Sequence, residues 1–127
     1  EGWNREVVVG DMDKGHAGLQ LLKAIITTVP GVPCIYQGDE YGEVGGNDPD
    51  NRHMMRFETL SLDERNMREK VAKLIHLRRN SMPLLYGDFI PLIDRPDEII
   101  YQRIYLGEKV TVIINRKDLT YQIINDK

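Results

Sequence analysis

The chain has few of the residues that several classes of small protein depend on. It contains one cysteine and one tryptophan, and aromatic residues make up only 7% of its 127 positions. A single cysteine cannot form an intrachain disulfide, which excludes a disulfide-stapled scaffold. Cys34 lies in an apolar run, so we expect it to pack as a small hydrophobic residue.

An excess of basic charge is also lacking. The 17 lysines and arginines are outnumbered by 20 aspartates and glutamates, which gives a formal net charge of −3. Proteins that bind nucleic acid present a basic surface to the phosphates, so we expect no nucleic-acid partner. The sequence shows neither a signal peptide nor an apolar run long enough to span a bilayer, so we expect no membrane partner.

What is present suffices for a packed core. Hydrophobic residues make up 41% of the chain, too many for a disordered segment. The length of 127 residues suggests one domain, with or without a small appendage. It is about half of the ~250 residues of an ordinary eight-stranded α/β barrel, so a complete barrel enzyme is excluded.

The most informative stretch is residues 31–57, GVPCIYQGDEYGEVGGNDPDNRHMMRF. Its apolar beginning, residues 32–36, predicts a buried strand, with Pro33 near the start where no backbone N–H is needed. A polar loop follows that is rich in Gly, Asn and Asp. A buried strand that leads into such a loop is a common way to present ligand-binding groups.

These motifs resemble a known family. GVPCIYQGDEYG followed by GGNDPDNRHMMRF is similar to the last barrel strand and its loop in the α-amylase superfamily of glycoside hydrolases, in particular the cyclomaltodextrinase and neopullulanase branch. The likeness continues to about residue 114. It implies that the chain is only the C-terminal part of such an enzyme, and that the missing N-terminal part of the barrel would be its partner.

Two helices are expected. Residues 16–29 have a narrow polar stripe, Gln20, Lys23 and Thr27, within a wide apolar surface, which predicts a largely buried helix that Pro30 ends. Ser61 and Glu64 have the spacing of a capping box, which predicts a second helix over residues 62–80.

Strands dominate the C-terminal part. We expect Met82-Pro83 to end the helix, and residues 84–93 to form one or two strands. Further strands are predicted over residues 99–106, 110–115 and 120–124, the first two joined by a hairpin with Gly107 at its first central position.

The expected fold class is therefore α+β, divided near residue 81. By the resemblance, residues 1–81 would be the terminal helix–strand–helix portion of a (β/α)8 TIM barrel. Residues 82–127 would be the small antiparallel β domain that follows amylase barrels.

Glycoside hydrolysis needs two carboxyl groups that flank the scissile bond. Asp39 and Glu40 are neighbours and would point to opposite faces of an extended backbone. The resemblance implies that all catalytic acids of the enzyme lie upstream. We therefore expect no catalytic residue here and an inactive chain, although the parent would be a retaining enzyme that hydrolyses α-glucans or cyclodextrins.

Asp48 and Arg52 form the candidate substrate-binding pair, four residues apart across a proline turn. Such a pair can grip sugar hydroxyls through charge-assisted hydrogen bonds, but sequence chemistry alone favours a loop-stabilising ion pair. The resemblance implies that the two residues hold a glucose unit beyond the cleavage point, and that Glu40 braces the base of the loop.

Metal and cofactor sites are not expected. Counted from Asp48, the EF-hand pattern fails at its fifth, sixth and twelfth positions. His53 and His76 lack ligand spacing and are interpreted as surface or packing residues. Asp11 and Asp13 are interpreted as solvated turn residues and Trp3 as a packing anchor. Residues 7–9 have the composition of a short strand, but their segment is interpreted mainly as loop.

Two alternatives stay open: a carbohydrate-binding module with an aromatic platform, and an interaction domain that retains part of a barrel. The candidates for the platform are Tyr101, Tyr105 and Tyr121. We also expect the chain to self-associate through residues 19–36, because a barrel strand without neighbours has open edges.

Overall fold

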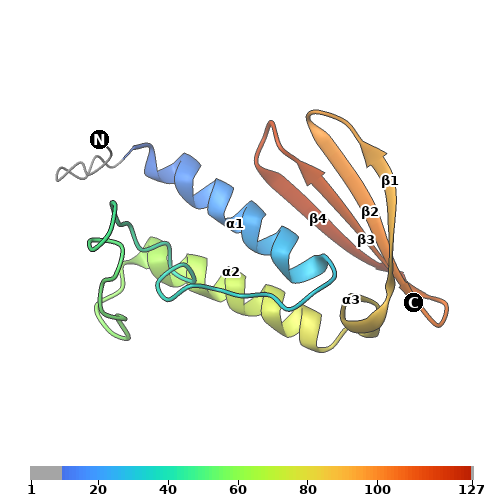
Figure 1. Cartoon of the computed structure of the whole chain (residues 1–127), viewed down its shortest axis with the longest axis horizontal. Helices are drawn as coiled ribbons and strands as arrows, with labels where there is room; N and C mark the ends of the chain where they lie inside the picture. The colour runs from blue at the N-terminus through green and yellow to red at the C-terminus, as the bar shows by residue number, and fades with distance from the viewer. Residues whose placement is uncertain (1–9, 127) are drawn as a thin grey trace.

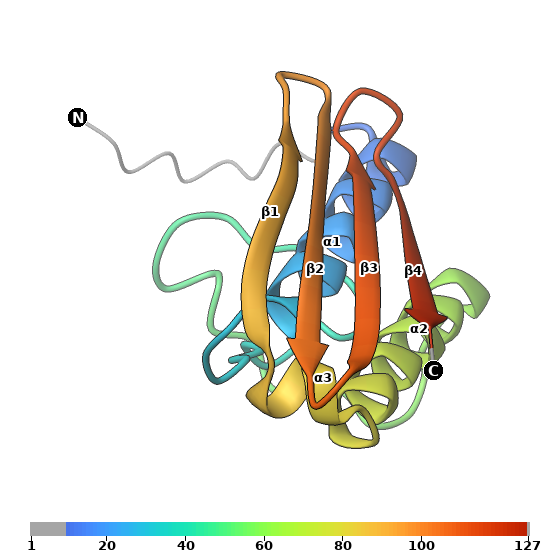
Figure 2. The same ribbon diagram turned by 90° about the vertical axis from the view of Figure 1, so that its right-hand side faces the viewer.

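The computed structural model describes residues 10–126, which form helices on one side of a four-stranded antiparallel sheet (Figure 1). The α+β class is therefore as predicted. The elements follow in the order α1 (Met12–Thr28), α2 (Leu62–Arg79), α3 (Met82–Tyr86), β1 (Asp88–Asp94), β2 (Glu98–Tyr105), β3 (Glu108–Asn115) and β4 (Thr120–Asp126). Figure 2 shows α1 running behind the sheet. The expectations for Trp3 and residues 7–9 lie outside the described residues.

Helix α1 begins earlier than predicted because Asp11 caps it. The Asp11 side chain accepts a hydrogen bond of 3.1 Å from the backbone N–H of Lys14, which satisfies one of the free donors of the first turn. The helix ends at Thr28, just before Pro30. Asp11, expected to be a solvated turn residue, is therefore an N-cap.

The polar stripe of α1 faces inward. Lys23 and Thr27 are only 2% and 0% exposed, whereas Leu22 on the neighbouring face is 49% exposed. Burial of these polar groups is tolerated because each has a partner: the Lys23 ammonium contacts Asp39 at 2.6 Å, and the Thr27 hydroxyl donates to the Lys23 carbonyl. The expectation of a mainly buried apolar surface was therefore only partly correct.

The predicted strand over residues 32–36 is absent, which corrects the sequence interpretation. All strands in residues 10–126 belong to the sheet β1–β4, so this segment has no neighbour with which to form a ladder. Val32 is 96% exposed, and Cys34 is also exposed rather than packed as a small hydrophobic residue. The prediction was therefore wrong about the strand and about its burial, because an apolar pattern does not by itself supply the partner that a strand requires.

Helix α2 has the predicted capping box. The Ser61 hydroxyl accepts from the Glu64 backbone N–H at 3.2 Å, and the Glu64 carboxylate accepts from the Ser61 backbone N–H at 2.7 Å. The buried side of the helix carries Met67, Val71 and Leu74. The second predicted helix is thus confirmed, ending at Arg79.

The short helix α3 replaces the start of a predicted strand. Met82-Pro83 was expected to end helical structure, but Pro83 lies in the first turn of α3, where its missing N–H leaves no bond unmade. Ser81 caps this turn by accepting from the Leu84 N–H at 3.4 Å. Strand β1 therefore begins only at Asp88.

The sheet has the sequential order β1-β2-β3-β4 with antiparallel neighbours throughout. The turn between β2 and β3 centres on Leu106 and Gly107, with φ angles of 48° and 88°. Positive φ at both central residues is typical of a type I′ hairpin. Gly107 consequently occupies the second central position, not the first as predicted.

One hydrophobic core joins the helices to the sheet. Its buried members come from α1, α3 and the inner face of β2 and β3: Leu21, Leu84, Tyr101, Val110, Val112 and Ile114. The Thr28 and Tyr101 hydroxyls meet at 2.5 Å across this boundary. The proposed division near residue 81 stays a prediction.

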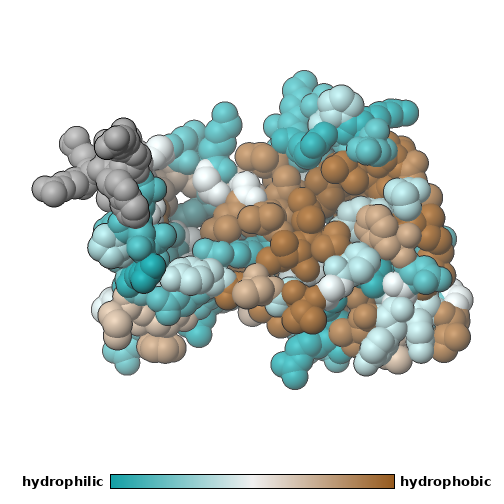
Figure 3. All heavy atoms as spheres, in the orientation of Figure 1, coloured by the Kyte–Doolittle hydropathy of each residue, from teal (hydrophilic) through white to brown (hydrophobic). Residues whose placement is uncertain are grey.

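The surface has two unlike regions. Figure 3 shows apolar residues gathered over the C-terminal half of α1 and the adjoining part of the sheet, whereas the loop end is mainly hydrophilic. Leu22 and Val32 are among the exposed large hydrophobic residues. Within the described part of the chain, no helix has the length and apolar character needed to cross a membrane.

Candidate functional site

The polar loop over residues 37–57 starts with a tight turn rather than extended backbone. The Tyr41 N–H and the Glu43 N–H both donate to the Gly38 carbonyl, and Gly38 has a φ of +92° that favours glycine. The neighbouring carboxylates of Asp39 and Glu40 still diverge. Asp39 pairs with Lys23, whereas Glu40 accepts from the Gly38 N–H at 2.8 Å.

Asp48 and Arg52 form an ion pair with two contacts. Arg52 Nε lies 2.5 Å from Asp48 Oδ1, and Arg52 Nη2 donates to Asp48 Oδ2 at 3.0 Å. The side chains remain 41% and 68% exposed, respectively. The structure thus brings the predicted pair together at an open position of the loop, and their role in sugar binding stays a prediction.

A second group of charged residues ties the loop to α2. The Arg56 guanidinium donates to the Glu43 carboxylate at 2.8 and 2.6 Å, and it also contacts Glu64 in the capping box of α2. These carboxylates raise the pKa of Arg56, and Arg56 in turn lowers the pKa of Glu64. The guanidinium carbon lies 5.2 Å from the ring centroid of buried Tyr41.

His53 extends this group toward the tip of the loop. Its Nδ1 lies 3.4 Å from Glu43 Oε1, and its Nε2 lies 3.2 Å from Asp50 Oδ1. Asp50 also accepts from the Gly46 N–H at 2.7 Å. The hydrogen bond to Asp50, followed by that to Glu43, raises the pKa of His53, while the Gly46 hydrogen bond is the main reason that the pKa of Asp50 is lowered.

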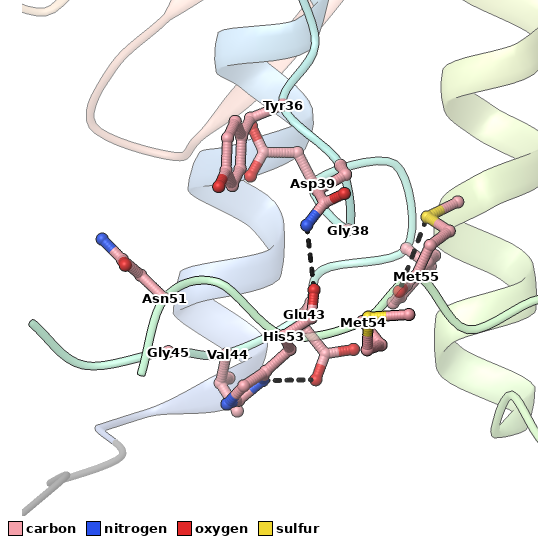
Figure 4. A pocket seen from close by; sticks show the side chains of 12 residues that line it. Tyr36, Gly38, Asp39, Glu43, Val44, Gly45, Asn51, His53, Met54 and Met55 are labelled. Carbon is pink, nitrogen blue, oxygen red and sulfur yellow. Dashed lines mark hydrogen bonds and ion pairs between the residues drawn. The ribbon is translucent and has the colours of Figure 1, made fainter. Parts of the chain in front are cut away.

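A pocket of about 230 Å³ opens between the two halves of the loop (Figure 4). Among its lining residues are Tyr36, Asp39, Glu43, Asn51 and His53. The close-up shows His53 and Glu43 side by side in its wall. Glu40, Asp48 and Arg52 are not among the described residues that line it, so the predicted binding residues and the pocket are neighbouring but distinct features.

The side chains that line the pocket can recognise a ligand by hydrogen bonding. Two carboxylates, two amides, an imidazole and two tyrosines line the pocket, and such groups can bind hydroxyl-bearing ligands. Among residues 10–126, no group of three or more His, Cys, Asp or Glu side chains is arranged to hold a metal ion. The loop therefore has the groups of a binding site for a polar ligand.

Sequence reasoning missed Glu43, His53 and Arg56. Glu43 and Arg56 are 13 positions apart, and their contact depends on how the loop folds back on itself. His53 was interpreted as a surface or packing residue, although its spacing of three from Asp50 offered a local signal. Nothing in the sequence spacing of Glu43 and Arg56 indicates that the two residues are in contact.

No family model matches the chain. It is 35% identical over 116 residues to a cyclomaltodextrinase of Geobacillus thermopakistaniensis, a match that covers 90% of this chain and 19% of that protein. It is 38% identical over 95 residues to a cyclomaltodextrin glucanotransferase of Geobacillus stearothermophilus, covering 73% of this chain and 13% of that one.

Solved structures agree. The α-amylase of Geobacillus thermoleovorans, crystallised in complex with acarbose, superposes with a TM-score of 0.73 at 29% identity, over 80% of this chain and 22% of that one. The chain spans about a fifth or less of the length of these curated relatives. It belongs to the α-amylase family and corresponds to a C-terminal region of the family's enzymes.

Proposed function

We propose that this chain is the C-terminal part of a retaining glycoside hydrolase that acts on α-glucans or cyclodextrins. In this proposal residues 1–81 complete the catalytic barrel, and residues 82–127 form the antiparallel domain that follows it. The catalytic acids belong to the partner N-terminal part. The names of the relatives, a cyclomaltodextrinase and a cyclomaltodextrin glucanotransferase, support cyclodextrins or related glucans as substrates.

The binding residues in this proposal are Asp48 and Arg52, with Glu40 bracing the base of the loop. The observation that carries it is the two-contact ion pair of Asp48 and Arg52, whose side chains stay open to solvent. A carboxylate accepts and a guanidinium donates, so together they can bind adjacent sugar hydroxyls with charge-assisted hydrogen bonds. The contact of Glu40 with the Gly38 N–H supports its bracing role.

The rival carbohydrate-binding module receives less support. Tyr101 is 3% exposed, and its hydroxyl contacts Thr28, so this ring faces the core and offers no open platform. Tyr121 also packs against the core. Tyr105 lies beside Tyr86, with ring centroids 5.9 Å apart and planes tilted by 46°.

The test compares cyclodextrin binding by the chain and its Asp48→Ala and Arg52→Ala variants, followed by calorimetry or by NMR shifts. Loss of one charge-assisted hydrogen bond should weaken binding by about 1.5–3 kcal/mol. Asp94→Ala and Arg65→Ala serve as matched controls, because they remove exposed charges on β1 and α2, outside the loop. Unchanged affinity in both loop variants would contradict the proposal, and loss with Tyr105→Ala would favour the module.

A further inference from the structure

His53 joins two parts of the loop that are separated in sequence. Glu43 lies before the glycine pair of the loop, and Asp50 lies after it, near the tip. The two imidazole nitrogens face one carboxylate each, at 3.4 Å for Glu43 and 3.2 Å for Asp50. The ring thus spans the base of the segment that contains Asp48 and Arg52.

The number of protons on the ring decides how many of these contacts are hydrogen bonds. A neutral imidazole has one N–H and one lone pair, so it can donate to one carboxylate while its lone pair faces the other. The imidazolium ion has two N–H groups and can donate to both. We propose that His53, Glu43 and Asp50 form a proton-dependent clasp that fixes the loop carrying Asp48 and Arg52.

Each end of the clasp is anchored independently. Glu43 is held by Arg56, which also contacts Glu64 at the start of α2. Asp50 accepts from the Gly46 N–H at 2.7 Å. The Asp50–Gly46 contact is internal to the loop, so His53 connects this turn to Glu43 and thereby to α2, and its protonation changes the order of residues 44–52.

Other charged groups near the clasp are engaged elsewhere. Asp39, in the wall of the same pocket, pairs with Lys23 of α1. Asp48 and Arg52 contact each other. The carboxylates that face the two ring nitrogens are therefore the groups whose charge the imidazolium complements.

The direction of the pH effect follows from the raised pKa of His53. Protonation is favoured in the folded loop, so the clasp is fully closed below the ordinary value of 6.5 and opens as the pH rises through the higher folded pKa. The inference concerns regulation of the proposed sugar site and rests on that function. The inference predicts that cyclodextrin binds more tightly at a pH below the folded pKa of His53 than at a pH above it.

Hydrogen exchange read by mass spectrometry tests the clasp without sugar, on the complete chain, between about pH 5 and about pH 8. Exchange of the imidazole C2 hydrogen reports the titration of His53, and amide exchange over residues 44–53 reports the order of the loop. We expect several-fold slower amide exchange, after correction for intrinsic rates, below the His53 midpoint than above it. His53→Gln, which cannot become charged, should abolish this pH dependence.

Asp50→Asn keeps an acceptor for Gly46 and removes the charge that faces the ring, so it should shift the His53 midpoint downward. Asp94→Asn, which removes a charge on β1, should leave it unchanged. Equal corrected exchange at both pH values, or a His53 midpoint that Asp50→Asn does not move, would overturn the clasp. Absence of cyclodextrin binding at every pH would instead overturn the proposed function and leave the exchange result standing.

Discussion

Arg78 of α2 and Arg103 of β2 both donate hydrogen bonds to the C-terminal end of α1. Arg78 Nη1 reaches the carbonyls of Thr27 and Val29 at 2.9 and 3.0 Å, and Arg103 Nη1 reaches that of Thr28 at 2.8 Å. These carbonyls lack partners within the helix and lie at the negative end of its dipole. Burial lowers the pKa of both arginines, and the Arg78 charge lowers that of Arg103 further.

Removal of the Arg103 guanidinium should destabilise the fold. Arg103→Met keeps much of the apolar stem but leaves the buried carbonyl of Thr28 and the part-buried carbonyl of Gly87 without their donors. We expect the free energy of unfolding to fall by about 2–4 kcal/mol. Urea unfolding followed by circular dichroism measures it. The control Arg65→Met changes an exposed position on α2, and its free energy of unfolding should stay within about 0.5 kcal/mol of that of the unsubstituted chain. An equal loss of stability in both variants would contradict the role of Arg103.

Glu64 should contribute to stability against acid. Its pKa is lowered chiefly by Arg56, so its contribution is present above the ordinary value of 4.5 and is lost as the pH falls through the lower folded value. Glu64→Gln retains a capping-box acceptor but has no charge to titrate. Thermal melts across the acid range should show a shallower loss of stability in this variant. In the control Glu69→Gln, stability should fall with pH as steeply as in the unsubstituted chain. The prediction would be rejected if Glu64→Gln lost stability with falling pH just as steeply.

The chain alone should self-associate through residues 19–36. Leu22 and Val32 are 49% and 96% exposed, and large apolar side chains left open to solvent favour association. Sedimentation velocity at micromolar concentration should show assemblies that Leu22→Lys with Val32→Lys disperses. Leu106→Lys, at an exposed turn, should not disperse them. The expectation would be mistaken if the unsubstituted chain were strictly monomeric and its amides 32–36 were protected from hydrogen exchange.

The chain alone should not hydrolyse α-glucans. Asp39 is paired with Lys23, and Glu40 is bonded to the Gly38 backbone, so the two carboxylates are committed to different partners. Neither is placed as one of two acids that flank a sugar bond. Incubation with maltooligosaccharides or cyclodextrin, followed by reducing-sugar assay, should show no product. Turnover that disappears in Asp39→Asn or Glu40→Gln would refute this expectation.

Local signals in the sequence predicted α2 and most of the sheet, but neither α3 nor the start of α1. The capping box of Ser61 and Glu64 and the alternating strands of the sheet act over a few residues, and the structure has them. Residues 32–36 differ because a strand is defined by its neighbour, which local pattern does not supply. Lys23 was buried through its pairing with Asp39, 16 positions away, so its exposure could not be judged from helix periodicity alone.

The candidate site likewise combines a local contact that the sequence predicted with long-range contacts that it did not. Asp48 and Arg52 are four residues apart across one turn, and the predicted proximity is present. The contact of Arg56 with Glu43 depends on the path of the whole loop, so the sequence alone did not indicate it. His53 lay between these cases: its neighbour Asp50 is local, whereas its second neighbour, Glu43, is not.

The end of α1 is the point at which the helical part and the sheet are fastened together. Arg78 reaches it from α2, whereas Arg103 and Tyr101 reach it from β2. These polar contacts act together with the hydrophobic core that spans the same boundary, to which Leu21 and Leu84 contribute from the helices and Val112 from the sheet. A substitution at this terminus should therefore affect the helices and the sheet together, because its carbonyls accept hydrogen bonds from α2 and from β2.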